Sequence, residues 1–481
     1  MKTTLNDTYK QFDGSLACTG GRFSSIALAA FIAFVLFGTA LFAVPGNAWA
    51  DVRKRDIILD QTVEQRNLSV SDCPSISATY AALISGDGEL YFSRAGDDDT
   101  QIASITKVMA AIVALDNADL SLDVKVSAKA AEIGESTAGL QEGDTMDLNT
   151  ALKAMLVPSG NDAAVAVAEA VGAKMIQDNP SLGDDPEKVF VDAMNKKAQE
   201  LGLEDTLYEN PHGLDDEEFK GDLHSTAIDQ TKVAKCAMTY QTIRDIVGGG
   251  STSISVMRNG KRATVDLETT DELLEMYKHA IGIKTGTTTL AGPSFMGAAN
   301  NDGKELYAVV LDSTDEYTRF EDAKALFLWA YEHVKDLSLA NTDVWTTMRK
   351  DGQSKEVPVV AEASHYEWID RTVKATLDDP DAMVNVFDLD GNVSQEVEFK
   401  ELHGTVNVGD KVGTIKFYQH NQVIAEHDLI ACERVDAPNP IDTIGIWWTR
   451  LTQGLDDKTG RAESVVHNVM PVIYNNTAYA A

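Results

Sequence analysis

A serine and a lysine three residues apart are the first residues of this sequence whose types and spacing suit catalysis. Ser104 and Lys107 begin the stretch from Ala103 to Leu115, A-S-I-T-K-V-M-A-A-I-V-A-L. On a helix, side chains three positions apart lie on one face. A serine hydroxyl needs an adjacent base, and a lysine amine can be that base once burial or nearby charge lowers its pKa. The uncharged residues after Lys107 predict a buried helix, which meets that requirement.

A turn with a second serine could supply a partner for this pair. Ser159 and Asn161 stand two residues apart in L-V-P-S-G-N-D. Pro158 and Gly160 predict a turn that aims both side chains in the same direction. The apolar run at 163–170 predicts a buried helix, so the turn is expected at a helix N-terminus.

A third stretch, A-I-G-I-K-T-G-T-T at 280–288, predicts a strand with one buried face. On such a strand Lys284 and Gly286 point to one side and Thr285 to the other. Because Gly286 has no side chain, a substrate backbone could approach the strand closely there. Taken singly, each stretch also has an ordinary structural explanation: a capping serine with a surface lysine, a polar turn, or an edge strand.

In this order, Ser-x-x-Lys, Ser-x-Asn and Lys-Thr-Gly resemble the motif set of penicillin-binding proteins and β-lactamases. From about Tyr80 to Val334 the chain resembles the low-molecular-mass penicillin-binding proteins, which are serine D-alanyl-D-alanine carboxypeptidases. The segment N-P-H-G-L-D at 210–215 and Arg319 in Y-T-R-F-E also match that family. For His212 in this segment, a hydrogen bond to loop backbone is preferred over a catalytic role.

The resemblance implies acyl transfer through a covalent serine intermediate on a peptidoglycan stem peptide that ends in D-Ala-D-Ala. Ser104 would attack the carbonyl carbon between the two D-alanines, and Lys107 would take its proton. Ser159, held by the Asn161 turn, would pass the proton to the departing D-alanine, while Lys284 keeps the local field positive. β-Lactam antibiotics would acylate the same serine.

The resemblance also implies which groups bind the substrate. The backbone N–H groups of Ser104 and Thr287 would form the oxyanion hole, and Gly286 would lie beside the substrate backbone. Thr285 and Arg319 would hold the terminal carboxylate, the arginine by a two-pronged hydrogen bond. No cofactor and no metal is expected, and the sequence lacks the H-E-x-x-H pattern of zinc peptidases.

Two other functions stay open from the sequence. A class A β-lactamase shares this chemistry but carries Ser-Asp-Asn and a Glu-x-x-Leu-Asn loop, whereas this chain has Ser-Gly-Asn and no such glutamate motif. A non-catalytic envelope-binding protein on the same fold would have lost some of the motif residues, which are all present here. Whether the enzyme trims stem peptides, cuts cross-links or does both is also open, because these activities share the motifs.

Composition and charge restrict the setting of this 481-residue chain. Its 44% hydrophobic and 24% charged residues are those of a globular protein, and its length allows two or three domains. The net charge of −34 argues against nucleic-acid binding and against a generally basic membrane-binding surface. The four cysteines, at 18, 73, 236 and 432, lack the spacing of a disulfide framework or a metal site, and their pairing stays open.

The first fifty residues predict export. Three basic residues precede an uncharged run from Phe23 to Val44, and Ala48-Trp-Ala50 offers a cleavage signal. We expect residues 1–50 to be a signal peptide and the mature chain to lie at the extracytoplasmic face of the cell membrane or in the cell wall. An uncleaved N-terminal anchor is the alternative, since the run is long enough to span a bilayer.

The elements around the motifs predict an α+β domain at 51–336, like that of β-lactamases and transpeptidases, in which helices lie against an antiparallel sheet. Residues 51–72 are expected to be a polar leader. We expect a hairpin at 77–94, helices at 103–115, 151–157, 163–170, 189–203, 225–240 and 319–334, and strands at 254–265, 280–284, 295–299 and 306–312. The nucleophile helix is expected between the helices and the sheet.

The remainder of the chain predicts two further parts. Short strands and turns indicate a small β-rich domain at 337–437, with its clearest hairpin at 411–418 and 422–430. At 438–481 we expect an amphipathic helix and a tail, because Ile441, Ile444, Trp448 and Leu451 share one helical face. The helix at Ile441 to Leu455 suits a membrane surface, but its single cationic residue makes packing on the protein an equal alternative.

Overall fold

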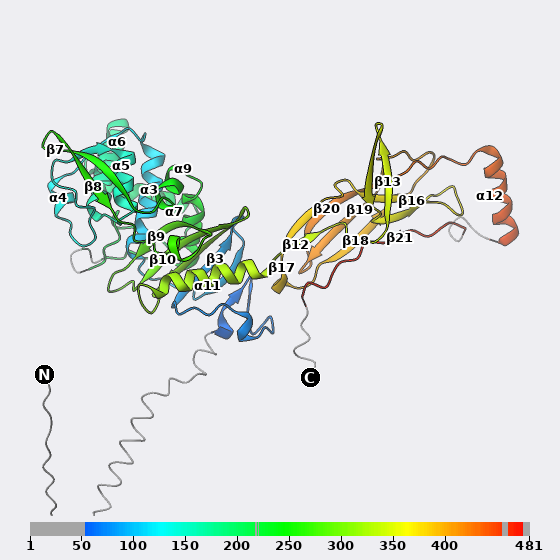
Figure 1. The fold of residues 1–481 in the computed structure, drawn as a ribbon, viewed down its shortest axis with the longest axis horizontal. Coiled ribbons are helices and arrows are strands. Elements are labelled where there is room, and N and C mark those ends of the chain that lie inside the picture. The colour runs from blue at the N-terminus through cyan, green and yellow to red at the C-terminus, as the bar shows by residue number, and fades with distance from the viewer. Residues whose placement is uncertain (1–52, 217–218, 220, 455–459, 475–481) are drawn as a thin grey trace, which may run out of the picture. The chain divides into compact units, whose positions relative to one another are not determined.

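The computed structural model describes residues 53–216, 219, 221–454 and 460–474 (Figure 1). The predicted signal peptide at 1–50 and Cys18 lie outside the described residues, as does the end of the C-terminal tail. The elements from β1 onward belong to one compact unit that begins at Asp56.

A seven-stranded antiparallel sheet lies at the centre of the region that carries the motifs. Its strands are, in spatial order, β2 (Gln61–Thr62), β1 (Ile57–Ile58), β4 (Leu90–Arg94), β3 (Tyr80–Ser85), β11 (Lys304–Leu311), β10 (Ser294–Asn301) and β9 (Ala280–Gly286). The predicted hairpin at 77–94 is confirmed as β3 and β4. The strands predicted at 280–284, 295–299 and 306–312 are confirmed as β9, β10 and β11.

The prediction of a polar leader at 51–72 is wrong for part of that segment. Strand β1 pairs with β4 and extends the sheet. Asp56, directly before β1, is buried, and its carboxylate lies 2.7 Å from the guanidinium of Arg94, which is buried as well. Asp56 is therefore buried against the sheet because its charge is paired there.

Alternate residues of the sheet face two different cores. Tyr307 and Val309 of β11 pack in the core that contains α8 (Ala227–Ala237) and the other helices of the motif region. The intervening Ala308 packs in the core that contains α11 (Thr318–His333), which Figure 1 shows lying along the sheet. The predicted arrangement of helices against an antiparallel sheet is thereby confirmed.

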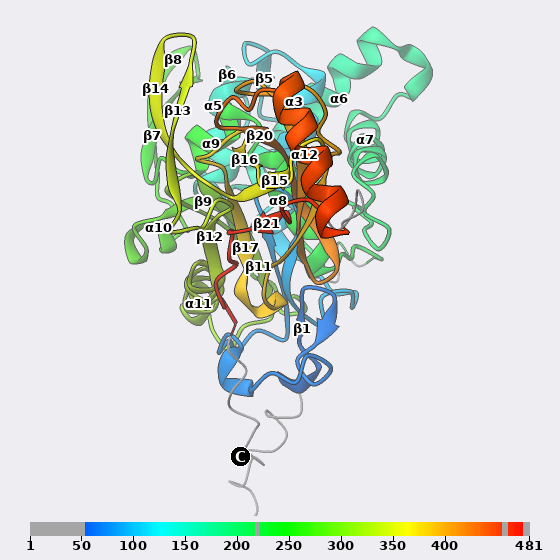
Figure 2. The same ribbon diagram turned by 90° about the vertical axis from the view of Figure 1, so that its right-hand side faces the viewer.

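The other helices predicted around the motifs are also confirmed. They are α3 (Thr106–Asn117), preceded by the 3-10 turn η2 (Ala103–Ile105), and α5 (Leu148–Leu156), α6 (Asn161–Asp178) and α7 (Pro186–Glu200), with short helices α4 (Ala128–Glu132), α9 (Gln241–Val247) and α10 (Leu273–Met276) in addition. In Figure 2 α5 and α6 lie above β9 and β11. Residues 106–114 of α3 are all buried, so the nucleophile segment lies inside the helical core.

A single strand predicted at 254–265 is in fact two. β7 (Thr252–Arg258) and β8 (Lys261–Leu267) form a hairpin, joined by Asn259 and Gly260. Both turn residues have positive φ, 51° and 71°, as the tight hairpin turns that favour Asn-Gly require. This hairpin continues a four-stranded sheet with β5 (Asp123–Lys125) and β6 (Thr145–Asp147).

The chain after α11 forms further β-structure around its own hydrophobic core. β12 (Val334–Ser338) follows α11 directly and pairs with β17 (Met383–Phe387), so the predicted boundary at 336 falls inside a strand. The hairpin β13 (Trp345–Lys350) and β14 (Gln353–Pro358) stands beside a six-stranded sheet of β18 (Ser394–Phe399), β19 (Lys411–Gln419), β20 (Gln422–Ala431), β16 (Thr372–Leu377), β15 (Ala361–Ser364) and β21 (Val465–Val466). The hairpin predicted at 411–430 is confirmed as β19 and β20.

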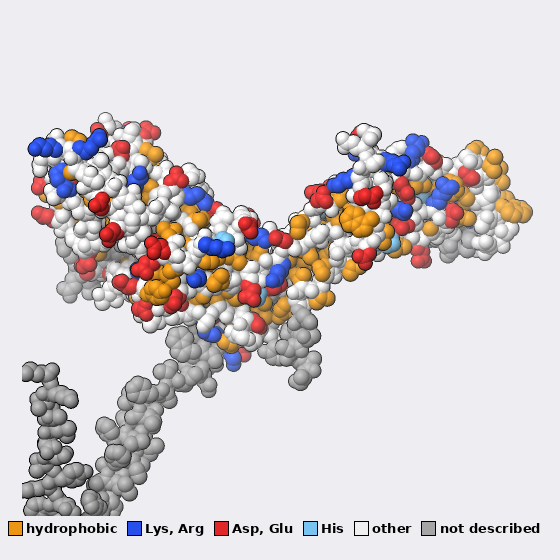
Figure 3. Space-filling model, in the orientation of Figure 1, with side chains coloured by type: hydrophobic (Ala, Val, Ile, Leu, Met, Phe, Trp, Pro, Cys, Tyr) orange, Lys and Arg blue, Asp and Glu red, His pale blue; other side chains and the backbone are white. Residues whose placement is uncertain are grey.

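The last helix, α12 (Pro440–Gln453), exposes most of its large apolar side chains. Ile446 is the one residue of α12 that is buried. Figure 3 shows hydrophobic side chains gathered on the surface over this helix. No helix within residues 53–454, apart from the undescribed 217–218 and 220, or within 460–474 is long and apolar enough to cross a membrane. Cys73, Cys236 and Cys432 are present as thiols.

Candidate active site

The Lys107 amine touches three oxygen atoms. Its Nζ lies 2.8 Å from the Ser104 hydroxyl, 2.6 Å from Asn161 Oδ1 and 2.8 Å from the backbone carbonyl oxygen of His212. An amide oxygen and a backbone carbonyl can only accept hydrogen bonds, whereas a hydroxyl can donate or accept. A neutral amine has two N–H bonds and one lone pair. Once Asn161 and His212 take both N–H bonds, the lone pair is left for the Ser104 O–H.

The surroundings of Lys107 favour this neutral form. Its side chain is fully buried at the start of α3. Burial lowers the pKa of Lys107 well below its ordinary value, the nearby charge of Lys284 lowers it further, and Asp162 acts in the opposite direction. The sequence condition for a lysine base, burial next to another cation, is therefore met in the structure.

The nucleophile follows a residue with a strained backbone. Ala103, directly before Ser104, has a φ of 47°, and Gly213 packs against it. A Cβ at Gly213, whose φ is 88°, would lie 1.9 Å from the Ala103 carbonyl oxygen. The N-P-H-G segment thus supports the nucleophile from one side, and only glycine fits there.

The turn at 159–161 places Asn161 at the first position of α6. Ser159 has a φ of 65°, and a Cβ on Gly160 would come within 2.6 Å of the Ala154 carbonyl oxygen. The Asn161 backbone N–H donates to Ser136 O at 2.8 Å, which fixes the turn. Ser159 is buried, and among the described residues its hydroxyl has no hydrogen-bond partner, so its predicted place beside the leaving group stays a prediction.

Lys284 lies fully buried near the end of β9. Its Nζ donates to the backbone carbonyl of Thr285 at 3.0 Å. Burial and, next, the charge of Arg319 lower the pKa of Lys284 to about 7, while Asp271 opposes that shift. At neutral pH the pKa of Lys284 is therefore close to the pH, and its protonated and neutral forms are both populated.

Gly286 has a different reason for being glycine than the sequence indicated. A Cβ at this position would lie 2.9 Å from the Ile102 carbonyl oxygen and 3.2 Å from the Ala103 Cβ. The space beside Gly286 is therefore filled by the turn that carries the nucleophile. The absent side chain lets β9 and η2 pack together, which brings the first and third motifs into contact.

Arg319 donates a hydrogen bond to Thr287. From the first turn of α11, its Nη1 donates to the Thr287 hydroxyl at 2.8 Å and approaches the Gly286 carbonyl oxygen at 3.4 Å. The Thr285 hydroxyl instead lies 2.6 Å from that of Thr270. The same Thr285 hydroxyl lies 3.4 Å from Lys284 Nζ. Thr287, directly after the end of β9, is therefore the threonine that shares a site with Arg319.

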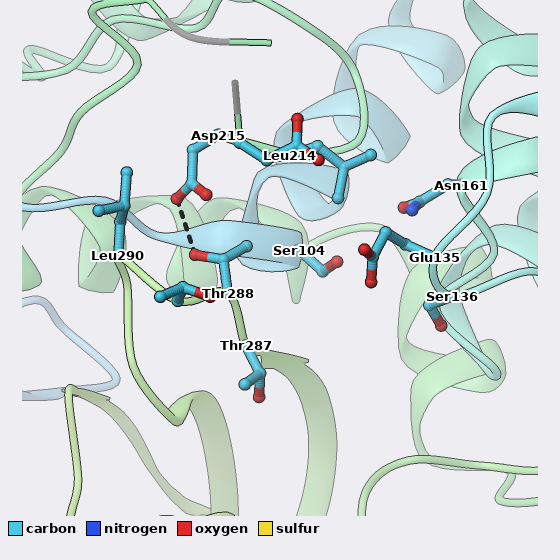
Figure 4. A pocket seen from close by; sticks show the side chains of 11 residues that line it. Ser104, Glu135, Ser136, Asn161, Leu214, Asp215, Thr287, Thr288 and Leu290 are labelled. Atoms are coloured by element: carbon cyan, nitrogen blue, oxygen red, sulfur yellow. Dashed lines mark hydrogen bonds between the residues drawn. The ribbon is translucent and has the colours of Figure 1, made fainter. Parts of the chain in front are cut away.

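A cavity of about 790 Å³ opens in front of the nucleophile (Figure 4). Ser104, Asn161 and Thr287 line it, together with Glu135, Ser136, Leu214, Asp215, Asp216, Thr288, Thr289 and Leu290. One wall is fixed by a hydrogen bond of 2.7 Å from the Thr288 hydroxyl to the Asp215 carboxylate. Lys107, Ser159, Lys284, Thr285 and Arg319 are buried and are not among the lining residues.

His212 is buried and its ring accepts a hydrogen bond from the Leu214 backbone N–H at 3.2 Å. Burial and then the charges of Lys107 and Lys129 lower the pKa of His212 to about 3, so the ring is neutral at physiological pH. The expected bond to loop backbone is present. The contribution of this residue to the site is its carbonyl oxygen, which the sequence did not indicate.

Other residues of the site were missed from the sequence. Glu135 and Ser136 come from the loop after α4, and Gly134 O accepts a hydrogen bond of 3.2 Å from the Asn161 amide. Thr270 is joined to Thr285 from a loop that lies 15 residues before it in the sequence. None of these residues lies in a recognisable pattern, and the contacts arise only when the chain folds. The Asp215 contact had a signal, since 210–215 already matched the family segment.

Comparison with known proteins gives three consistent results. Residues 67–315 match the family model described as D-alanyl-D-alanine carboxypeptidase. The D-alanyl-D-alanine carboxypeptidase DacF of Bacillus subtilis is 28% identical over 366 residues, 74% of this chain and 85% of that protein. The D-alanyl-D-alanine carboxypeptidase of Streptomyces sp. strain K15 is 32% identical over 267 residues, 54% of this chain and 88% of that protein.

The fold gives a matching result. The crystal structure of the Streptomyces K15 DD-transpeptidase superposes with a TM-score of 0.50 at 29% identity, covering 54% of this chain and 98% of that one. The motif-carrying region therefore has the sheet-and-helix fold of that transpeptidase.

Proposed function

The chain belongs to the D-alanyl-D-alanine carboxypeptidase family, and from this membership we propose how its own residues carry out the reaction. It is a serine-type D-Ala-D-Ala carboxypeptidase that acts on peptidoglycan peptides and reacts with β-lactams. In our proposal Ser104 is the nucleophile, Lys107 its base, and the cavity in front of Ser104 the substrate site. The observation that carries the proposal is the distance of 2.8 Å between Lys107 Nζ and Ser104 Oγ. Lys107 is buried, and burial lowers its pKa, which favours the neutral amine that a base requires.

Acylation follows from these contacts. The Ser104 oxygen attacks the carbonyl carbon of the penultimate D-alanine, and its proton moves to the lone pair of Lys107. The backbone N–H groups of Ser104 and Thr287, both at the cavity, are the proposed donors to the oxyanion. The C–N bond then breaks, and the departing D-alanine nitrogen receives the proton by way of Ser159. Water later releases the peptide from Ser104.

Binding of the terminal carboxylate is proposed for the part of the cavity at Thr287, next to which Arg319 is buried. The hydrogen bond from Arg319 to the Thr287 hydroxyl supports a site formed by these two residues, with the ammonium of Lys284 nearby. Thr285 is proposed to contribute to the same site, supported by its hydroxyl lying 3.4 Å from Lys284 Nζ. A carboxylate accepts well from a guanidinium and a hydroxyl together.

Release of D-alanine tests the proposal. The chain without residues 1–50 is incubated with a peptide ending in D-Ala-D-Ala, next to its Ser104→Ala variant, and free D-alanine is recorded. Release by the first protein and none by the variant supports the proposed nucleophile. Equal release by both would refute it, since a peptide bond cannot then be cut through Ser104.

Penicillin distinguishes the two alternatives. A lasting adduct is expected for a carboxypeptidase, whereas rapid turnover of penicillin without D-alanine release would indicate a β-lactamase. Neither an adduct nor D-alanine release would indicate a non-catalytic envelope-binding protein on the same fold.

We further propose that the protein is exported and that its C-terminal part docks it to a lipid surface. Residues 337–437 would form a β-rich spacer domain, supported by its own hydrophobic core. The exposed face of α12 would enter the membrane interface, supported by Ile441 at 81%, Ile444 at 67% and Trp448 at 60% exposure. The cleavable signal peptide at 1–50 remains a prediction from the sequence.

A further inference from the structure

A short segment before α10 connects two of the motifs, and no pattern in the sequence indicates this. The Thr270 backbone N–H donates to the Val157 carbonyl oxygen at 3.2 Å, next to the Ser159 turn. The Thr270 hydroxyl lies 2.6 Å from that of Thr285 in the Lys-Thr-Gly strand. The residue after it, Asp271, is only 4% exposed, so a carboxyl group is buried directly beside this connection.

Only one of the two oxygen atoms of the Asp271 carboxyl group accepts a hydrogen bond among the described residues. Oδ1 accepts a hydrogen bond of 2.9 Å from the backbone N–H of Leu273, the first residue of the short helix α10. Oδ2 is buried and, among the described residues, has no hydrogen-bond partner. An unpaired carboxylate oxygen is costly to bury unless a positive charge lies nearby. Lys284 is the cation that the contacts bring toward this carboxyl group, since the Thr285 hydroxyl lies 2.6 Å from that of Thr270 and 3.4 Å from Lys284 Nζ. Burial raises the pKa of Asp271, and the charges of Lys284 and Arg319 oppose that rise.

We propose that Asp271 is a positioning residue, whose buried carboxylate keeps Lys284 in its ammonium form. This inference rests on the proposed role of Lys284 in the substrate site. Without a nearby anion, Lys284 would be a fully buried cation facing a second cation, Arg319. Asp271 is the buried anion that offsets both, from a loop that the Thr270 hydrogen bonds attach to the site.

The charged groups around this cluster come from several elements. Lys284 of β9 faces Arg319 of α11 and Asp271. Lys107 of α3 faces Lys284 and Asp162 of α6, and Arg319 also faces Glu316 and Glu272. Asp162 is already bonded by the backbone N–H groups of residues 138, 140 and 163. Asp271 and Lys284, each with a pKa moved by burial to about 7, therefore titrate together around neutral pH.

The pH dependence of penicillin acylation tests the proposal. Asp271→Asn removes the charge but keeps an amide oxygen that can accept from the Leu273 N–H. Glu272→Gln removes an exposed neighbouring carboxylate whose charge also acts on Arg319. We expect the alkaline limb of the second-order acylation rate to move to lower pH in Asp271→Asn, by about one unit, or about tenfold in rate on that limb. Glu272→Gln should leave the limb in place, and Lys284→Arg, which stays charged, should remove it.

Two results would overturn the inference: an alkaline limb in Asp271→Asn that coincides with the wild-type limb, or an equal shift in Glu272→Gln. Asp271→Ser, which also retains a side-chain oxygen that can accept a hydrogen bond, is the second variant should Asp271→Asn unfold, and the same shift is expected for it. A lasting adduct on wild-type protein establishes the proposed function independently. Failure of the inference alone would thus appear as normal acylation with an unmoved pH profile.

Discussion

Lys107 has two N–H bonds when neutral, and this number determines the direction of the proton transfer. Its two obligatory acceptors are Asn161 Oδ1 and the His212 carbonyl oxygen. The Ser104 hydroxyl is the remaining neighbour and can donate its proton to the amine. Burial supplies the other requirement, because it lowers the pKa of Lys107. The role of Asn161 is thereby to orient the base.

Burial of the His212 ring makes the free energy of unfolding depend on pH, because it lowers the pKa of this residue. Its pKa is about 3 in the fold and 6.5 ordinarily, so between these values the unfolded chain binds a proton that the folded chain does not. Stability therefore falls as pH drops below 6.5, by up to about 1.4 kcal/mol per pH unit from this group.

Denaturant unfolding at several pH values measures this effect. We expect the wild-type free energy of unfolding to fall more steeply between pH 6.5 and 4 than that of His212→Asn, whose side chain does not titrate. Parallel curves for the two proteins would show that the ring is not held in its neutral form.

Residue types and spacing predicted that Ser104 and Lys107 share one face and that Asn161 lies at a turn, since a helix and a tight turn fix local geometry, and the structure brings the three side chains into contact. Types and spacing could not pair Arg319 with Thr287, because that contact joins α11 to the end of β9. Asp271 is a similar case. Its proposed role depends on the hydrogen bond between Thr270 and Thr285, which attaches the loop before α10 to the end of β9.

At the scale of elements, close backbone contacts hold the site together. Gly213 and Gly286 let the N-P-H-G segment and β9 reach the turn around Ala103 from different directions. The sequence predicted most helices and strands because their apolar periodicity is clear. It missed the division of β7 from β8, although Asn259-Gly260 is a strong hairpin signal, because apolar alternation continues on both sides. It also missed β1, whose two isoleucines are too short a run to indicate a strand.

Gly213→Ala tests the contact with the nucleophile turn. A Cβ there meets the Ala103 carbonyl oxygen and also occupies a left-handed φ, so we expect a loss of about 2–4 kcal/mol in stability and slower acylation by penicillin. Gly202→Ala is the matched control, because its φ is 66° and nothing lies within 4 Å of its Cβ. Equal effects of the two variants on acylation would show that the contact is unimportant.

The exposed face of α12 can be tested by vesicle binding. Ile444→Asp places a charge in the middle of that face, whereas Gln453→Asp adds the same charge on the opposite side of the helix, nine residues on. We expect the first variant to bind phospholipid vesicles at least about tenfold more weakly, the value of one buried isoleucine, and the second to bind as wild type does. Vesicle binding that neither change weakens would contradict docking through this face.

At the scale of the whole molecule, the net charge of −34 opposes the approach of an anionic substrate. Arg319 and Lys284 are buried, while Glu135 and Asp216 are exposed at the cavity, so the attraction acts only at short range. Salt screens the exposed charges, because the Debye length falls from about 30 Å at 0.01 M to about 8 Å at 0.15 M.

We therefore expect the acylation rate with anionic penicillin to rise severalfold over this range of salt, and that with an uncharged penicillin ester to change little. A rate that falls with salt would mean that the cations of the site, and not the molecule as a whole, guide the approach.

The most direct test of the account is the intact mass of the protein after exposure to penicillin, for wild type, Ser104→Ala and Lys107→Met. Methionine is apolar and of similar length, so it suits a position that is fully buried. The account predicts one penicillin per wild-type chain, located at Ser104 by peptide mapping, and no adduct on either variant. Acylation of Lys107→Met at the wild-type rate would contradict the assignment of Lys107 as the base that activates Ser104.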